Sequence, residues 1–202
     1  MERIGILGGT FDPPHYGHLL LGEIASQQLS LDRVLFMPAG APPHKPERDL
    51  TADDLRLQMV ALAIQGNERF AVDDLDMRRP PPHYTVTLMK QLRDRFPEAQ
   101  LWLLAGSDSL ADLPNWREPV ELVQLCRLAI LPRPDSPVSW DELERSIPAL
   151  RTNVDWLEGP SYQLSSTQIR HLRREGRTVR YMLPDAVRLF LETNELYGTT
   201  VD

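Results

Sequence analysis

The chain has 202 residues, a length typical of one domain with a hydrophobic core of its own. Its formal net charge of −7 argues against a broad basic surface for nucleic acid or an anionic membrane, so any phosphate binding has to be local. Cys126 is the single cysteine, which excludes an intrachain disulfide. The chain shows neither an export signal at its start nor an apolar run close to the ~20 residues of a membrane span, so we expect a cytoplasmic protein.

Short apolar runs alternate along the chain with helical patterns. The runs typical of buried strands lie at residues 3–7, 33–37, 70–72, 101–105, 128–131 and 154–157. Helical spacing or helix-start signals lie at residues 19–25, 51–64, 85–92, 106–108, 135–148, 164–170 and 183–197. This alternation predicts an α/β fold, a Rossmann-like doubly wound parallel sheet with helices on both faces. We expect a single domain over residues 1–202, with a helical C-terminal part from about residue 165.

The first strand runs directly into the string GGTFDPPHYGH, residues 8–18. Gly8 and Gly9 let the backbone approach a ligand closely, and the free N–H groups at the start of the following helix attract anions. His15 and His18 are three residues apart in that first turn, where both imidazoles can donate hydrogen bonds to one phosphate. Protonated imidazoles would also stabilise charge on a pentavalent phosphorus. A lone His is usually a surface or capping residue, but the pair within this string favours a phosphate site.

Two loops follow later strands, at the edge where α/β folds bind ligands. A proline-stiffened loop after the second strand ends in His44 and Lys45, although an exposed Lys by itself would be a plain surface residue. Three successive prolines hold a later loop extended up to Tyr84 or Thr85, where a helix begins. Free backbone N–H groups at that helix start can bind a carboxylate or a phosphate.

The strand at residues 101–105 ends at Gly106, and Asp108 follows at the start of the next helix. Asp108 is either an ordinary N-cap, which typically contributes about 1 kcal/mol, or a carboxylate that accepts hydrogen bonds from a ribose. Trp116 follows a proline turn, and its flat ring is either part of the core or a surface for a planar aromatic ligand.

The stretch LSSTQIR near the C-terminus is the second predicted phosphate-binding segment. Ser165 and Gln168 form a capping box, which predicts a helix N-terminus. Ser166 and Thr167 supply hydroxyls there, and Arg170 lies on the same face one turn further on, so one phosphate can meet all of them. We assign the other arginines of this stretch to a solvated helix face: Arg173, Arg174 and Arg177.

Together these stretches resemble the bacterial nicotinate-nucleotide adenylyltransferases, which belong to the nucleotidyltransferase superfamily that shares the His-x-Gly-His motif with class I aminoacyl-tRNA synthetases. The resemblance covers most of the chain. It rests on residues 8–13 with His15 and His18, on 42–45, 84–85, 87–88, 106–108, Trp116, 165–167, 169–170, 180–181 and 183–184. A lone His-x-Gly-His is a weak signal, whereas the whole string at residues 8–18 is specific. The family pattern Gly-Pro-Ser-Tyr-Thr is replaced in this chain by Pro81-Pro82-His83-Tyr84-Thr85.

The resemblance implies transfer of AMP from ATP to nicotinate mononucleotide, which yields deamido-NAD and pyrophosphate in NAD biosynthesis. It implies that His15, His18 and Arg170 are catalytic. The residues implied for ATP binding are Gly8, Gly9, Thr10, Phe11, His18, Ser166, Thr167 and Arg170. Those implied for the acceptor are His44, Lys45, Tyr84, Thr85, Gly106, Asp108, Trp116 and Arg133. We expect Mg²⁺ to arrive with ATP rather than in a protein-built site, and we expect neither a nucleic acid nor a membrane as a partner.

Three other functions are compatible with parts of this pattern. An adenylyltransferase for another acceptor, nicotinamide mononucleotide or phosphopantetheine, would share the first string and the Ser-Ser-Thr motif. A non-catalytic nucleotide-sensing module would keep the fold, although both histidines and Arg170 are present. A redox dehydrogenase fits least, because Gly-x-x-Gly-Gly-Thr lacks the Gly-x-Gly-x-x-Gly spacing of a dinucleotide-binding turn.

Overall fold

A computed structural model describes residues 1–40, 50–134, 138–160 and 163–198. Its parallel strands form one sheet in the order β3-β2-β1-β4-β5-β6. The strands are β1 (Arg3–Gly9), β2 (Arg33–Pro38), β3 (Phe70–Val72), β4 (Gln100–Gly106), β5 (Arg127–Leu131) and β6 (Val154–Trp156). The strand order reverses between β1 and β4, which is the switch point where open α/β sheets bind ligands. The predicted doubly wound parallel sheet is confirmed.

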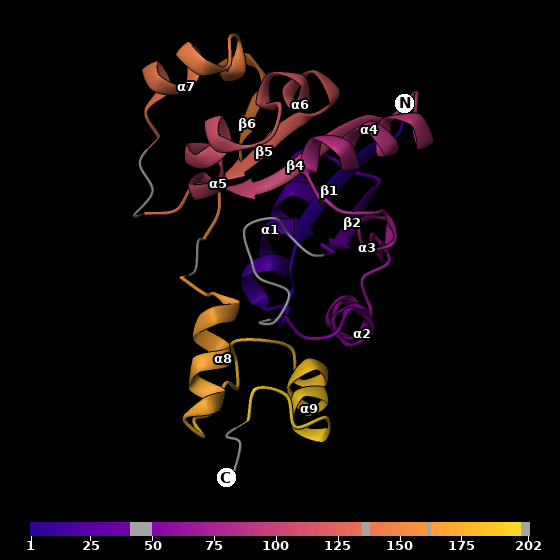
Figure 1. Ribbon diagram of the computed structural model, residues 1–202, viewed down its shortest axis with the longest axis vertical. Coiled ribbons are helices and arrows are strands. Elements are labelled where there is room, and N and C mark those ends of the chain that lie inside the picture. The colour runs from indigo at the N-terminus through magenta and orange to yellow at the C-terminus, as the bar shows by residue number, and fades with distance from the viewer. Residues whose placement is uncertain (41–49, 135–137, 161–162, 199–202) are drawn as a thin grey trace.

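Helices cover both faces of this sheet (Figure 1). They are α1 (Tyr16–Gln28), α2 (Asp53–Ile64), α3 (Leu75–Arg78), α4 (Thr85–Arg95), α5 (Ser107–Asp112), α6 (Pro119–Leu125), α7 (Trp140–Ser146), α8 (Ser166–Arg174) and α9 (Asp185–Thr193). Side chains of α4, α6 and α7 pack on one face, and those of α1 and α2 pack on the other. None of the helices in the described part of the chain has the length and apolar content of a membrane span.

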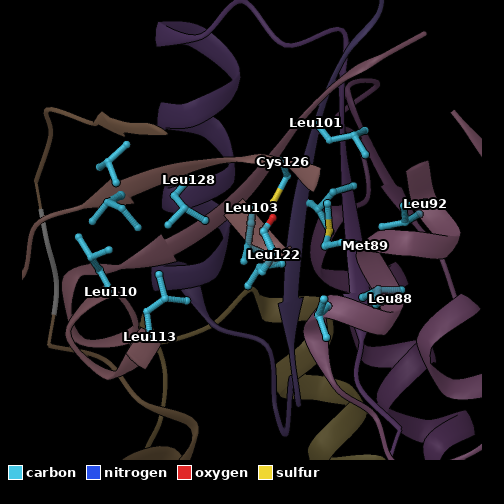
Figure 2. Close-up of a cluster of buried hydrophobic side chains, with 14 of the residues drawn as sticks. Leu88, Met89, Leu92, Leu101, Leu103, Leu110, Leu113, Leu122, Cys126 and Leu128 are labelled. Carbon is cyan, nitrogen blue, oxygen red and sulfur yellow. Dashed lines mark hydrogen bonds between the residues drawn. The ribbon is translucent and has the colours of Figure 1, made fainter. Parts of the chain in front are cut away.

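The central strand β4 shows why its sequence reads as an unbroken apolar run. Leu101 and Leu103 point to the face covered by α4, and Trp102 and Leu104 point to the face covered by α1. Figure 2 shows the first of these faces, where both leucines belong to one cluster with Leu88, Met89 and Leu92 of α4. Each fully buried Leu contributes about 1.5–3 kcal/mol relative to an exposed one, so a strand covered on both sides is apolar at every position.

Helix α2 begins later than its sequence pattern predicts, and its buried face also includes an arginine. The expected N-cap was Thr51, but the N-cap is Ala52, and the Thr51 hydroxyl donates to the Tyr197 hydroxyl at 3.0 Å. Met59 and Ala63 of this helix are buried and Leu55 is partly buried, but Arg56 is completely buried as well. Arg56 tolerates burial because its guanidinium donates to backbone carbonyl groups and forms an ion pair.

The last two helices pack on α2 rather than on the sheet, and they lie at the end of the molecule opposite α6 and α7 (Figure 1). The Ser165 hydroxyl accepts a hydrogen bond from the backbone N–H of Gln168 at 3.1 Å, which confirms the predicted cap of α8. The apolar residues that join the three helices include Met59, Ala63, Ile169, Leu172, Val187 and Leu191. This packing fixes the start of α8 against the carboxyl ends of the strands.

Candidate active site

The loop between β1 and α1, residues 8–18, is the signature loop of this site. A Cβ atom added to Gly8 would meet no other atom within 4 Å, so a ligand can approach the strand end closely. Phe11 has a φ of 48°, a left-handed conformation that costs a residue with a side chain roughly 1–2 kcal/mol. Its fully buried ring packs against the rings of His18 and Phe36, at centroid distances of 4.8 and 5.9 Å. This burial offsets the backbone strain and fixes the shape of the loop.

The two histidines of the signature loop are stacked, with ring centroids 3.8 Å apart and an interplanar angle of 24°. The backbone N–H of His15 donates to Nδ1 of His18 at 3.2 Å. A nitrogen that accepts a hydrogen bond carries no hydrogen, so the neutral His18 ring carries its hydrogen on Nε2. Nδ1 of His15 is buried and has no hydrogen-bond partner among the described residues. The pair therefore keeps ring nitrogens available for a bound group.

Both imidazoles are neutral at pH 7 before a ligand binds. Burial, reinforced by the positive charge of Arg133, lowers the pKa of His15 to about 4. Burial also holds the pKa of His18 well below 6.5, with further lowering by His15 and Arg133. The sequence leaves both protonation states open, and burial selects the neutral state of both imidazoles in the unliganded site. Both histidines are therefore neutral in the unliganded site, and Arg133 places a positive charge near them.

The lowered pKa of His15 predicts that the protein loses stability as the pH falls from 6.5 towards 4. In that range the unfolded chain binds a proton at this imidazole and the folded chain does not. The free energy of unfolding therefore rises with pH, and it reaches its full value above pH 6.5. The total change is about 3 kcal/mol, from 1.36 kcal/mol per pKa unit. Urea unfolding of the wild type and of His15→Gln at several pH values measures it. Parallel pH dependence in the two proteins would contradict the prediction.

The start of α8 is attached to the signature loop. The hydroxyl of Ser166 donates to the carbonyl oxygen of Pro13 at 2.8 Å, and Nη1 of Arg170 donates to the carbonyl oxygen of Asp12, also at 2.8 Å. Nη2 of Arg170 lies 3.5 Å from the hydroxyl of Thr167. A guanidinium has five N–H donors, so others remain for a phosphate. The two predicted phosphate-binding segments therefore lie side by side, although Asp12 and Arg170 are 158 residues apart in the chain.

Asp108 and Arg133 form an ion pair beside the same strand ends. Nη1 of Arg133 donates to Oδ2 of Asp108 at 3.0 Å, and the backbone N–H of Arg133 donates to the Ser107 hydroxyl at 2.8 Å. The N-cap of α5 is Gly106, so the alternative that Asp108 is an N-cap is wrong. A Cβ atom on Gly106 would lie 2.5 Å from Oδ1 of Asp108 and 2.8 Å from Nε of Arg133. A larger residue at position 106 would therefore require the Asp108 and Arg133 side chains to shift.

Tyr84, Thr85 and Trp116 lie on the other side of the sheet from Phe11. Tyr84 and Trp116 pack against the same apolar cluster, and the guanidinium carbon of Arg117 lies 5.9 Å from the centre of the Tyr84 ring. Thr85 is the first residue of α4, where backbone N–H groups have no partner within the helix. The Nε1–H of Trp116 donates to Asp112 at 3.1 Å, which orients the indole. Tyr84 and Arg117, the neighbour of Trp116, therefore lie close together on the face of the sheet covered by α4.

The predicted residues His44 and Lys45 lie outside the described residues. Just before them in the chain, Gly40 follows β2, and a Cβ atom there would lie 2.2 Å from the imidazole of His83. His83 therefore packs on the backbone after β2, where the family pattern has the smaller Ser. Its Nδ1 is buried and has no hydrogen-bond partner among the described residues.

Sequence reasoning missed the groups that support the signature loop from behind. The Asp12 carboxylate is fully buried and accepts a hydrogen bond from the hydroxyl of Tyr197. Arg56 donates to the carbonyl oxygen of Thr10 at 2.8 Å. Asp12 belongs to the quoted string, but no local pattern marked Arg56 or Tyr197, because an Arg on a helix and a Tyr near the end of a chain are usually surface residues.

Comparison with known proteins agrees with this geometry. The family model described as Cytidylyltransferase-like matches residues 6–172. A probable nicotinate-nucleotide adenylyltransferase of Thermomicrobium roseum is 44% identical over 199 residues, which cover 98% of this chain and 93% of the relative. One from a Synechococcus species is 43% identical over 196 residues, which cover 97% of this chain and 95% of the relative.

Among solved structures, the Plasmodium falciparum nicotinic acid mononucleotide adenylyltransferase complexed with NaAD matches with a TM-score of 0.80 over 100% of both chains. At 19% identity this match supports the fold alone. The family model and the identity to the curated relatives cover nearly the whole chain. The chain therefore belongs to the cytidylyltransferase-like family of nucleotidyltransferases and, within it, to the nicotinate-nucleotide adenylyltransferases.

Proposed function

We propose that the protein transfers the adenylyl group of ATP to nicotinate mononucleotide, producing deamido-NAD and pyrophosphate. The curated relatives carry the name of this activity. The observation that supports it most strongly is the position of Arg170, whose guanidinium donates to the carbonyl oxygen of Asp12 in the same loop as His15 and His18. Hydrogen-bond donors from distant segments that meet at one strand end suit the stabilisation of charge on a triphosphate.

The proposed reaction is a direct in-line displacement at the α-phosphorus of ATP. A phosphate oxygen of nicotinate mononucleotide attacks this phosphorus and forms a new P–O bond. The bond from the α-phosphorus to the oxygen that bridges to the β-phosphorus breaks, and its electron pair leaves with pyrophosphate. The attacking phosphate is already ionised at pH 7, so no general base is needed, and catalysis consists of positioning and charge stabilisation.

The side chains divide into an ATP group and an acceptor group in this proposal. His15, His18 and Arg170 contact the triphosphate, and Ser166 and Thr167 lie beside it at the start of α8. Gly8, Gly9, Thr10 and Phe11 shape the loop that admits it. The proposed acceptor group consists of His44, Lys45, Tyr84, Thr85, Gly106, Asp108, Trp116 and Arg133. Within it, the backbone at Thr85 binds the nicotinate carboxylate, the Trp116 ring stacks on the pyridine ring, and Asp108 accepts a hydrogen bond from a ribose.

We propose that Mg²⁺ arrives with ATP. The described residues contain no group of three His, Cys, Asp or Glu side chains able to hold a metal ion. The imidazoles, hydroxyls and guanidiniums around the strand end are donors that suit phosphate oxygens, and the Asp12 and Asp108 carboxylates there are paired with Tyr197 and Arg133. When bound, Mg²⁺ neutralises charge on the phosphates, and the protein contributes through the phosphates rather than through its own metal ligands.

A comparison of acceptors tests the proposed substrate. With ATP and Mg²⁺, we expect kcat/KM for nicotinate mononucleotide to exceed that for nicotinamide mononucleotide at least about tenfold, because a charged carboxylate gains more from backbone N–H donors than a neutral amide does. Formation of the dinucleotide is measured for each acceptor, including phosphopantetheine, with ATP alone as the control. A preference for another acceptor would show that the substrate is wrong. No pyrophosphate with any acceptor would favour a nucleotide-sensing module.

A further inference from the structure

The Asp12 carboxylate of the signature loop is held by groups from three distant segments. The Tyr197 hydroxyl, which follows α9, donates to its Oδ1, and the backbone N–H of Thr51 lies 3.5 Å from its Oδ2. Nη1 of Arg170 lies 3.9 Å from the same Oδ2. A fully buried carboxylate is tolerated only where such partners replace water. The structure thus places this charge beside the guanidinium that we assign to the triphosphate.

The Tyr197 hydroxyl is itself fixed from a second side. The Thr51 hydroxyl donates to it at 3.0 Å, and the Thr51 carbonyl oxygen accepts from Nε of the buried Arg56 at 3.0 Å. Burial and the negative charge of Asp12 raise the pKa of Tyr197, so the phenol stays protonated and donates at every pH at which the protein works. Its single hydrogen therefore has one recipient, Asp12.

The geometry points to Tyr197 as a positioning residue that holds the Asp12 carboxylate and so limits its ion pairing with Arg170. This inference rests on the proposed function. Arg170 already donates to the main-chain carbonyl of Asp12. If the phenol were lost, Oδ1 of Asp12 would lack its donor, and the carboxylate would turn towards the guanidinium. Arg170 would then pair more tightly with Asp12 and would be less available to the triphosphate.

Tyr197→Phe tests this inference, because it removes the hydroxyl and keeps the ring. We expect the affinity for ATP with Mg²⁺, measured by titration calorimetry without acceptor, to fall about tenfold, the loss typical of a hydrogen bond to a charged group. Tyr181→Phe is the matched control, because the Tyr181 side chain is exposed and is not among the groups that contact Asp12. The control should bind ATP like the wild type. Unchanged affinity in Tyr197→Phe would overturn the inference.

A double-mutant cycle separates positioning from simple structural support. If Tyr197 acts through Arg170, then Tyr197→Phe should cause no further loss of ATP affinity or of kcat in an Arg170→Ala background. A merely structural role predicts the same fractional loss in both backgrounds, and that result would overturn the inference. Thr51→Val offers a second route if Tyr197→Phe does not fold, because it removes only the hydroxyl that fixes the phenol. Its expected loss of affinity is about threefold, and it too should vanish without Arg170.

Because calorimetry measures ATP binding without the acceptor, it tests the role of Tyr197 separately from the proposed reaction. A wild-type protein that binds ATP but makes no dinucleotide would refute the proposed function, and the calorimetric cycle would still decide the role of Tyr197. A wild-type protein that does not bind ATP would overturn both.

Discussion

His18→Ala is expected to lower kcat by about 10²- to 10³-fold, the usual cost of removing one aligned donor to a transition-state oxyanion. The neutral ring carries its hydrogen on Nε2, because Nδ1 accepts from the backbone N–H of His15. Removing the ring therefore removes a donor that is already oriented. Steady-state turnover with saturating ATP and nicotinate mononucleotide measures the loss. His171→Ala is the control, because His171 is exposed on α8 and paired with Glu175 at 3.2 Å.

Two further substitutions at His18 identify which nitrogen matters. A Gln side chain reaches far enough to place an amide N–H near the position of Nε2, whereas Asn can only reproduce the acceptor at Nδ1. If the donor to phosphate is the catalytic feature, His18→Gln retains more activity than His18→Asn. If Asn is the better replacement, the contribution of His18 is to cap the helix start. Wild-type turnover in His18→Ala would remove this residue from the mechanism.

Arg170→Ala is expected to lower kcat/KM for ATP by about 10²-fold, because it removes charge-assisted hydrogen bonds to the triphosphate. Arg170→Lys should recover only part of the loss, since an ammonium restores the charge but not the two donating edges of a guanidinium. Arg174→Ala provides the matched control, because Arg174 is exposed four residues further along the same helix. Initial rates at varied ATP and saturating acceptor give the comparison. An equal loss in Arg170→Ala and Arg174→Ala would mean that general basicity, rather than position, explains the effect.

These predictions reflect a division of roles within the site. The chain as a whole is acidic, with a net charge of −7, so a triphosphate needs local compensation. In the proposed site, Arg133 and Arg170 are the guanidinium groups available to compensate the charge of the phosphates. The histidines, held neutral by burial and by Arg133, supply directed N–H groups. A neutral donor close to a fixed cation needs no protonation step before ATP binds.

The strands follow from local apolar runs, and their prediction is confirmed for that reason. Helices α3 and α6 were not predicted. An apolar run such as residues 101–105 has no polar face, so it fits only a strand covered on both sides, which is where β4 lies. The Ser165 cap is also local, because its hydroxyl satisfies an N–H three residues away. The start of α2 was misplaced because Thr51 bonds to Tyr197, a residue 146 positions away.

The sequence by itself determined the α/β class, the signature loop and the capped start of α8, because each depends on residues that are neighbours in the chain. Only the tertiary structure decided the strand order, the Asp108–Arg133 pair, the neutral state of the two histidines and the link between Tyr197 and Asp12. A pKa depends on how far burial removes a group from water, and a long-range hydrogen bond depends on how helices pack. Neither quantity exists until the sheet and its covering helices have assembled.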